Sequence, residues 1–200
     1  IHHFETVRNF FEITKPQFCI NCAAYTAVDK AEEEKDLAFQ INAEAVGVLA
    51  AVCQKYSTQF IHISTDYVFD GTATAPYKED AVTNPVNTYG ATKLKGEQEA
   101  LQYNPSSIII RTSWVYSEFG KNFVKTMMKL MSEREELKVV NDQVGSPTYA
   151  ADLAEAILRI INVSQTSSSN WQPGIYHFSN SGIISWYDFA VAIKEISESK

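Results

Sequence analysis

The sequence has few basic residues and no cluster of them. It contains 17 lysines and arginines and 24 aspartates and glutamates, which gives a formal net charge of −7. Because nucleic-acid binding needs Lys and Arg gathered on one surface, we expect no DNA or RNA partner. The sequence also lacks an apolar run of the roughly 20 residues needed to cross a bilayer, and it lacks a basic-then-apolar leader. These absences predict a cytoplasmic protein without a membrane segment.

Cysteine is scarce and odd in number. The three cysteines, Cys19, Cys22 and Cys53, do not predict the disulfide framework of a secreted protein. Cys19 and Cys22 have C-x-x-C spacing, but their neighbours predict a buried strand, on which positions i and i+3 point to opposite faces. The second ligand pair that a zinc site requires is missing. The sequence therefore predicts neither a redox pair nor a metal site.

The 200 residues are 45% hydrophobic, enough to bury a sizeable core. Short apolar segments alternate with helical patterns along the chain. Strands are predicted at 18–22, 59–64, 107–112, 137–140 and 174–178. An amphipathic stretch covers 7–14, helices are predicted at 36–56, 88–102, 120–134 and 149–161, and a Ser-rich linker covers 164–172. A last helix begins at Ser185, with Asp188 completing a capping-box pattern. This alternation predicts an α/β, doubly wound parallel sheet of the Rossmann type, with ligands at the carboxyl ends of the strands.

Tyr89 is the one tyrosine among ten with a lysine four residues later. Tyr89 and Lys93 fall early on a predicted helix, where positions i and i+4 share a face. A nearby ammonium would favour the phenolate and lower the pKa of Tyr89, as proton delivery to a ketone oxygen requires. Taken alone, this spacing more often arises from a chance pair on a surface helix.

Hydroxyl groups and a carboxylate follow the predicted strand at 59–64. Ser64, Thr65 and Asp66 lie at its carboxyl end, one element before Tyr89. A hydroxyl there could hydrogen-bond the substrate oxygen that Tyr89 protonates. The alternative is structural, with Ser64 and Thr65 capping a loop and Asp70 forming a turn.

Longer strings resemble one family. The similarity runs in order over residues 21–32, 64–71, 89–93, 111–116, 122–123 and 141–148, which spell NCAAYTAVDKAE, STDYVFDG, YGATK, RTSWVY, NF and NDQVGSPT. These strings resemble the dTDP-4-dehydrorhamnose reductases, which are extended short-chain dehydrogenase/reductases. The resemblance implies NAD(P)H-dependent reduction of the 4-keto group of dTDP-4-dehydro-L-rhamnose to dTDP-L-rhamnose, in nucleotide-sugar biosynthesis.

The resemblance also implies roles for particular residues. The catalytic set would be Thr65, Tyr89 and Lys93, with Tyr89 as the proton donor. The NADPH or NADH cofactor would contact Ala23, Ala24, Tyr25, Tyr89 and Lys93. The substrate would contact Asp66 and Trp114, although Trp114 could instead be a core residue. Family members are associated with magnesium, but no ligand can be assigned in this sequence. The implied partner is a nucleotide sugar, and a homodimer is a candidate assembly.

The sequence departs from the family pattern at its start. A glycine-rich turn that would hold a pyrophosphate at a helix N-terminus is absent. The resemblance implies that the first βαβ unit and the C-terminal end of the family fold lie outside these 200 residues. We therefore predict a partial NAD(P)-binding domain at 1–115 and 149–180, and parts of a small substrate-binding subdomain at 116–148 and 181–200.

Two other functions stay open. One is an epimerase or dehydratase of the same superfamily, and the other is a non-catalytic regulatory relative such as the β subunit of methionine adenosyltransferase. Turnover of a keto sugar would separate the regulatory relative from an enzyme. His62, His177 and Asn42 are expected to be structural. The acidic run 32–34 is expected to be a solvated helix start.

Overall fold

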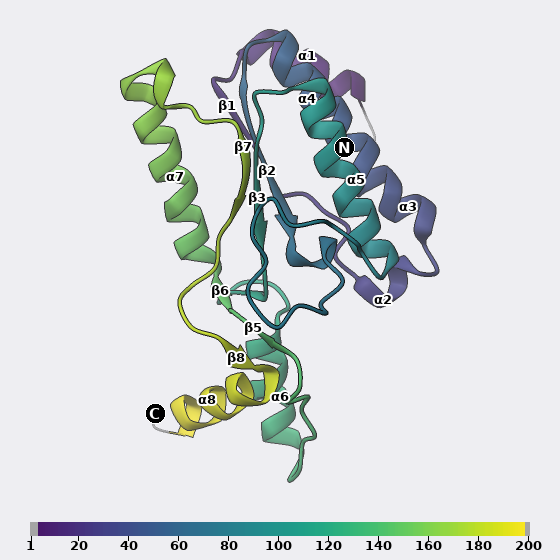
Figure 1. Cartoon of the computed structure of the whole chain (residues 1–200), viewed down its shortest axis with the longest axis vertical. Coiled ribbons are helices and arrows are strands. Elements are labelled where there is room, and N and C mark those ends of the chain that lie inside the picture. Colours follow the sequence, from purple (N-terminus) through teal and green to yellow (C-terminus); the bar gives the residue numbers. More distant parts are fainter. Residues whose placement is uncertain (1–3, 199–200) are drawn as a thin grey trace. The chain divides into compact units, whose positions relative to one another are not determined.

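The computed structural model describes residues 4–198 (Figure 1). The described chain divides into two compact units. The first runs to Arg111 and also contains Val163–His177. The second comprises Thr112–Asn162 and the chain from Phe178 onward. Each unit is described separately below.

A four-stranded sheet organises the first unit. Its order is β1 (Phe18–Asn21), β2 (Gln59–Thr65), β3 (Ile108–Thr112) and β7 (Gly174–His177). β1 pairs in parallel with β2, and β3 pairs in parallel with β7. Every residue of β3 is buried, as expected for a central parallel strand. Four of the five predicted strands, at 18–22, 59–64, 107–112 and 174–178, are confirmed to within two residues at each end, and so is the α/β class with parallel pairing.

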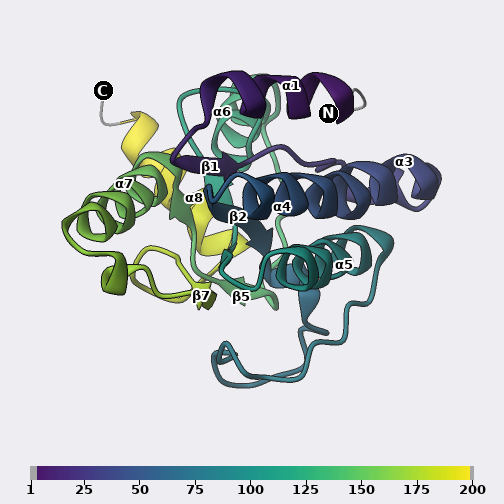
Figure 2. The same cartoon turned by 90° about the horizontal axis from the view of Figure 1, so that it is seen from above.

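The helices of the first unit pack beside this sheet. They are α1 (Phe4–Thr14), α2 (Val28–Ala31), α3 (Lys35–Phe39), α4 (Ala45–Lys55) and α5 (Thr88–Tyr103). One turn of π-helix, η1 (Gln40–Glu44), joins α3 to α4, and short 3-10 turns occupy η2 (Asp66–Val68) and η3 (Ser168–Asn170). α4 and α5 lie side by side in both views (Figures 1 and 2). The apolar core between helices and sheet includes Val46, Phe60, Ala100 and Ile109.

The continuous helix Lys35–Lys55 is 21 residues long and apolar enough, by length and composition, to cross a membrane. The prediction that no segment is long and apolar enough to cross a bilayer is therefore wrong by length and composition. Of its most apolar window, 56% is buried inside the protein, mainly by packing against α5. Such burial is typical of the core helix of a folded domain.

The second unit contains short strands and three helices. Its strands are β4 (Val115–Tyr116), β5 (Val144–Gly145), β6 (Thr148–Tyr149) and β8 (Ile184–Ser185). β4 pairs in parallel with β6, and β5 pairs antiparallel with β8. Its helices are α6 (Phe123–Glu133), α7 (Ala150–Thr166), whose last turn enters the first unit, and α8 (Trp186–Glu198). α6 and α8 pack through an apolar cluster that contains Met127 and Phe189.

The predicted capping box at the start of α8 is confirmed. The Oγ of Ser185 accepts a hydrogen bond from the backbone N–H of Asp188 at 3.0 Å. The Asp188 carboxylate accepts in return from the backbone N–H of Ser185 at 2.9 Å. The two donors at this helix end are therefore satisfied reciprocally.

The predicted strand at 137–140 is wrong. These residues form no ladder, and the backbone carbonyl of Val140 instead accepts a hydrogen bond from the N–H of Tyr187 at 2.9 Å. The β-branched pattern had no neighbouring strand with which to pair. The predicted linker at 164–172 is also shorter than expected, because α7 continues to Thr166. Most of α7 belongs to the second unit, whereas the predicted domain boundaries assigned this helix to the NAD(P)-binding domain. The functions assigned to the two predicted domains stay predictions.

Candidate functional site

The predicted catalytic residues lie together in the first unit. Thr65 is the last residue of β2, and Tyr89 and Lys93 lie on the first two turns of α5. The two side chains are close enough for the hydroxyl of Thr65 to influence the pKa of Tyr89. The arrangement places a hydroxyl, a phenol and an amine at the carboxyl end of a parallel strand, the usual ligand site of an open α/β sheet.

The start of α5 is fixed by two acceptors. The N-cap Asn87 accepts a hydrogen bond from the backbone N–H of Gly90 at 2.7 Å. The carboxylate of Glu32 accepts from both the N–H and the Oγ1 of Thr88, each at 2.7 Å. These bonds satisfy N–H groups that a helix cannot pair internally. Glu32, which was expected to be a solvated charge, therefore holds the turn that carries Tyr89.

A close backbone approach requires a glycine directly after Tyr89. A Cβ atom at Gly90 would lie 2.1 Å from the backbone oxygen of Tyr67, so a larger residue would push α5 away from η2. The contact also brings the rings of Tyr67 and Tyr89 edge to face, with centroids 5.4 Å apart. The glycine therefore determines how closely Tyr89 approaches the end of β2.

The pKa of Tyr89 differs in direction from the sequence expectation. Burial of the phenol raises this pKa, and the neighbouring hydroxyl of Thr65 lowers it to a lesser extent. Lys93 was expected to lower the pKa of Tyr89, but its amine contacts other groups. The Lys93 Nζ donates to the backbone carbonyl of Ile63 at 2.7 Å and lies 3.3 Å from Nε2 of His62. Tyr89 is consequently held as a protonated phenol, the form that can donate a proton.

Lys93 is almost completely buried, with 2% of its surface exposed. Burial lowers its pKa from the ordinary 10.5 to about 8, although the negative charge of Glu97 and the nearby Cys22 act in the opposite direction. Glu97 is itself engaged by the guanidinium of Arg111 at 2.7 Å and by the hydroxyl of Ser64. Lys93 is thus a buried amine that titrates close to neutral pH.

Asp66 lies beside Thr65, as predicted. Its carboxylate accepts a hydrogen bond from the Oγ1 of Thr65 at 3.1 Å. Burial raises the pKa of Asp66, and the hydrogen bond from Thr65 opposes this rise. A carboxyl group of this kind can accept a hydrogen bond from a sugar hydroxyl or donate one when protonated.

The predicted cofactor segment follows β1. Ala23 is exposed and Ala24 is half-buried, so neither side chain covers the backbone there. The N–H of Ala23 donates to the Oδ1 of Asn21 at 3.1 Å. The phenol of Tyr25 donates to Glu34 at 2.7 Å, and this contact raises the pKa of Tyr25 to about 12.

Asn42 anchors this segment, a role that the sequence analysis did not predict. It is fully buried in the π-turn η1. Its Oδ1 accepts from the N–H of Tyr25 at 2.8 Å, and its Nδ2 donates to the Tyr25 carbonyl and to Oγ1 of Thr92, both at 3.1 Å. A π-turn in an otherwise α-helical stretch often marks a functional site, but only the structure reveals it.

Trp114 lies in the second unit, where it packs against protein groups. Its ring stacks on that of Trp186, with centroids 3.6 Å apart and an interplanar angle of 14°. Its other close neighbour is Gly145, whose missing side chain leaves room for the indole. Its backbone has φ of 48°. These contacts support the structural alternative for Trp114, and its contact with a sugar stays a prediction.

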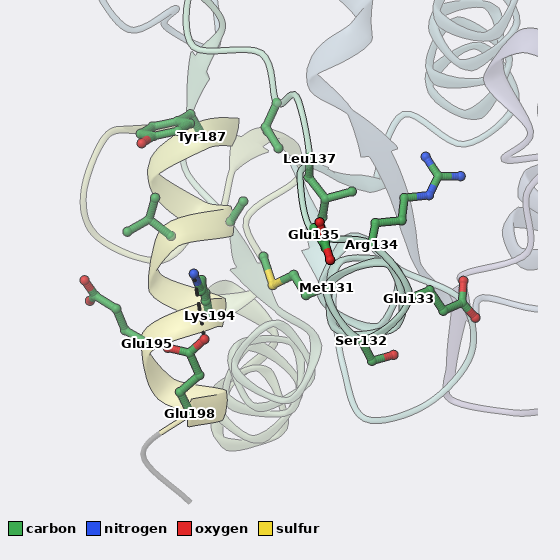
Figure 3. A pocket seen from close by; sticks show the side chains of 13 residues that line it. Met131, Ser132, Glu133, Arg134, Glu135, Leu137, Tyr187, Lys194, Glu195 and Glu198 are labelled. Atoms are coloured by element: carbon green, nitrogen blue, oxygen red, sulfur yellow. Dashed lines mark ion pairs between the residues drawn. The ribbon is translucent and has the colours of Figure 1, made fainter.

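A groove of about 840 Å³ also lies in the second unit, between the end of α6, the following loop and α8 (Figure 3). Its lining combines apolar side chains such as Met131 and Leu137 with charged ones, including Lys194 and Glu198, which form an ion pair at 3.8 Å. The predicted site residues do not line this groove.

Within residues 4–198, no group of three or more His, Cys, Asp or Glu side chains could hold a metal ion. The cysteines are free thiols, and Cys19 hydrogen-bonds with Cys53 rather than pairing with Cys22. The C-x-x-C spacing therefore brings together no redox pair in this structure.

Known proteins similar to this chain point to one family. The family model for the RmlD substrate binding domain matches residues 1–200. The spore coat polysaccharide biosynthesis protein SpsK of Bacillus subtilis is 47% identical over 192 residues, which cover 96% of this chain and 65% of that protein. The dTDP-4-dehydrorhamnose reductase of Aggregatibacter actinomycetemcomitans is 44% identical over 192 residues, which cover 94% and 64%.

A solved structure agrees with these relatives. The dTDP-4-dehydrorhamnose reductase of Bacillus anthracis, in complex with NADP, superimposes with a TM-score of 0.92 at 42% identity and covers 98% of this chain and 67% of that one. The resemblance to these reductases and the Rossmann-type fold are confirmed. The chain spans about 65% of the length of the curated relatives that it matches. Because the family model matches along the entire sequence, this chain belongs to the family of the RmlD substrate binding domain.

Proposed function

We propose that the whole protein is an NAD(P)H-dependent reductase that converts dTDP-4-dehydro-L-rhamnose to dTDP-L-rhamnose. The observation that carries the proposal is the placement of Thr65 at the end of β2, beside Tyr89 and the buried amine of Lys93 on the first two turns of α5. Relatives with this activity are 44% identical over nearly the entire chain. A protonated phenol oriented by a hydroxyl is what the reduction of a ketone to an alcohol requires.

The reaction needs one hydride and one proton. A bound reduced nicotinamide supplies the hydride, which adds to C4 of the sugar. Tyr89 donates its phenolic proton to the carbonyl oxygen, so the ketone becomes a secondary alcohol. Thr65 orients the same oxygen by hydrogen bonding, and Lys93 supplies positive charge close to the site when it is protonated.

The segment after β1 has the properties expected of the cofactor site. Ala23 and Ala24 have methyl side chains that leave the backbone open to a flat ring, and Tyr25 is fixed by Asn42. Lys93 and Tyr89 lie on the neighbouring α5 and could contact ribose hydroxyls. These residues fit NADPH or NADH, and the NADP complex of the Bacillus anthracis reductase supports the choice of a nicotinamide nucleotide.

The substrate contacts are proposed for both units. Asp66, next to Thr65, would bind a sugar hydroxyl. Trp114 and residues 141–148 of the second unit would bind the nucleotide sugar. A cytoplasmic location is part of the same proposal. The homodimer and the magnesium ion stay predictions.

The test is turnover. The whole protein is mixed with NADPH or NADH and enzymatically prepared dTDP-4-dehydro-L-rhamnose, and cofactor absorbance is followed over time. We expect oxidation by the unmodified protein and a loss of about 10²-fold or more in kcat for Tyr89→Phe, the usual scale for a general acid. Tyr103→Phe, an exposed tyrosine on the same helix, is the matched control and should retain full activity.

Two outcomes would contradict the proposal. Cofactor binding without oxidation would favour the regulatory relative. Equal turnover by the unmodified protein and Tyr89→Phe would remove Tyr89 from the mechanism. The same assay on the 200-residue chain measures whether these residues suffice for cofactor use.

A further inference from the structure

The end of strand β2 holds one face of helix α5 at consecutive positions. The carbonyl of Ile63 accepts a hydrogen bond from Nζ of Lys93 at 2.7 Å. The next residue, Ser64, donates a hydrogen bond from its hydroxyl to the carboxylate of Glu97. Lys93 and Glu97 are four residues apart on α5, so they share a helix face. The strand therefore fixes an amine and a carboxylate as neighbours on that face.

The carboxylate of Glu97 is held in one orientation. Besides Ser64, the guanidinium of Arg111 on β3 binds both carboxylate oxygens, with Nε 2.9 Å from Oε1 and Nη2 2.7 Å from Oε2. Glu97 is 2% exposed and Arg111 is 4% exposed. These hydrogen bonds come from two strands, so the carboxylate cannot turn without breaking several of them. The negative charge of Glu97 is consequently fixed in place and shielded from water.

The amine of Lys93 is equally enclosed, with 2% of the residue exposed. A buried ammonium is unfavourable unless an opposite charge lies nearby, because the protein interior solvates it poorly. Lys93 and Glu97 are held by different partners, so their charges interact through space rather than by direct contact. In the interior such an interaction persists over several ångströms, because little water screens it. Glu97 therefore offsets part of the cost of burying the ammonium.

Within residues 4–198, the other groups that face Lys93 do not supply this negative charge. Burial and the charge of Lys93 lower the pKa of His62 on β2, so its Nε2, 3.3 Å from the amine, belongs to a neutral ring that can accept a hydrogen bond. Burial raises the pKa of Cys22, which follows β1, so its thiol is uncharged near neutral pH. The carboxyl group of Asp66 acts on Tyr89. Glu97 is the negative charge that remains.

We propose that Glu97 is a positioning residue whose fixed carboxylate keeps the amine of Lys93 positively charged beside Tyr89. Ser64 and Arg111 act through Glu97, because they determine where its charge lies. A structural role alone, as one half of an internal ion pair, would leave the charge of Lys93 independent of Glu97. The proposed reaction uses this positive charge, and in this respect the inference rests on the proposed function.

The first test is the titration of Lys93 in the whole protein, followed by the ¹³Cε signal that Lys93→Met removes. Glu97→Gln keeps the size of the side chain and deletes its charge, so it should lower the pKa of Lys93 by about one unit. Glu99→Gln is the matched control, because Glu99 lies on the same helix but pairs with Lys95 at 2.7 Å, and it should leave the titration unchanged. An unchanged pKa of Lys93 in Glu97→Gln would overturn the proposal.

A second variant separates the charge of Glu97 from its ion pair. Glu97→Gln leaves the guanidinium of Arg111 buried without its partner, which destabilises the fold, whereas Arg111→Met/Glu97→Leu leaves neither charge behind. Arg111 reaches the carboxylate from β3, and β2 holds the amine of Lys93, so the carboxylate is the nearer charge to the amine. The double variant should therefore still lower the pKa of Lys93, by about half a unit or more. An unchanged or higher pKa would refute the role of Glu97, whether or not Glu97→Gln folds.

The pH dependence of turnover tests the connection to the proposed reaction. If the reaction requires the ammonium of Lys93, activity falls as the pH rises through the pKa of this amine. In Arg111→Met/Glu97→Leu the fall should occur at lower pH than in the unmodified protein, by the same amount as the titration shifts. A titration that shifts without the pH profile would support the role of Glu97 and contradict the use of this charge in the reaction. The titration needs no turnover, so a failure of the proposed function is distinguishable from a failure of this inference.

Discussion

Removing the side chain of Asn42 should loosen the cofactor segment and destabilise the first unit. Asn42→Ala deletes three hydrogen bonds, two to the backbone of Tyr25 and one to Thr92. Each bond contributes about 1 kcal/mol, and a partner left unsatisfied costs about 1–3 kcal/mol where water cannot replace the amide. Tyr25 is half-buried, so water can reach part of its backbone. We expect a total loss of about 2–4 kcal/mol in the free energy of unfolding.

Urea unfolding followed by circular dichroism measures this loss. Asn84→Ala is the matched control, because Asn84 also donates a side-chain hydrogen bond, at 3.3 Å to Asp70, but in an exposed position. We expect the control to change stability by less than about 0.5 kcal/mol. Equal stabilities of the two variants would show that Asn42 does not hold the segment. In the whole protein, Asn42→Ala should also raise the KM for the cofactor more than it lowers kcat.

Three further substitutions test the packing described above. Gly96→Ala places a Cβ 2.0 Å from the backbone oxygen of Asn42, so α5 must move, and thermal unfolding should report a loss of about 1–3 kcal/mol. Arg111→Met leaves the carboxylate of Glu97 buried without its ion pair, which should lower the free energy of unfolding by about 3–5 kcal/mol. The double variant Arg111→Met/Glu97→Leu should restore most of this stability. A double variant as unstable as the single one would contradict this account. Ser185→Ala removes the cap of α8 and should cost about 1 kcal/mol in urea unfolding, whereas Ser185→Thr should retain most of the stability.

Much of the first unit could be predicted because its elements follow from local pattern. Four apolar segments became the sheet strands β1, β2, β3 and β7 within two residues of their predicted ends. Parallel pairing followed from the helices between them. The strand expected at 137–140 failed because a β-branched pattern specifies a strand only where a partner strand is available, and there the chain meets α8 instead.

The predicted site residues could be recognised in the sequence where they lie on the same helix or at the end of the same strand. Tyr89 and Lys93 are four residues apart on one helix, and Thr65 ends the strand before it. The direction of the pKa change at Tyr89 was not predictable from spacing. It depends mainly on how deeply the fold buries the phenol, and the amine of Lys93, which would have opposed the rise, contacts Ile63 and His62 instead.

The supporting residues were missed because their partners are distant in sequence. Glu32 caps a helix that begins 56 residues later, and Asn42 bonds Thr92 across 50 residues. In the sequence, a glutamate in an acidic run and an asparagine inside a helix have ordinary surface or structural interpretations. The contacts that give Glu32 and Asn42 their roles form only when the fold brings the segment after β1, η1 and α5 together.

The buried polar groups of the first unit are of two kinds, and the difference bears on function. The pair of Arg111 and Glu97 has opposite charges in fixed geometry, so its members have no alternative arrangement that preserves their bonds. The link from Ala23 through Asn21 and His62 to Lys93 is made of groups that can each reverse between donor and acceptor, except for the backbone N–H at its start. The core of the sheet is therefore held by opposite charges in fixed geometry, beside a buried series whose hydrogen bonds have more than one possible direction.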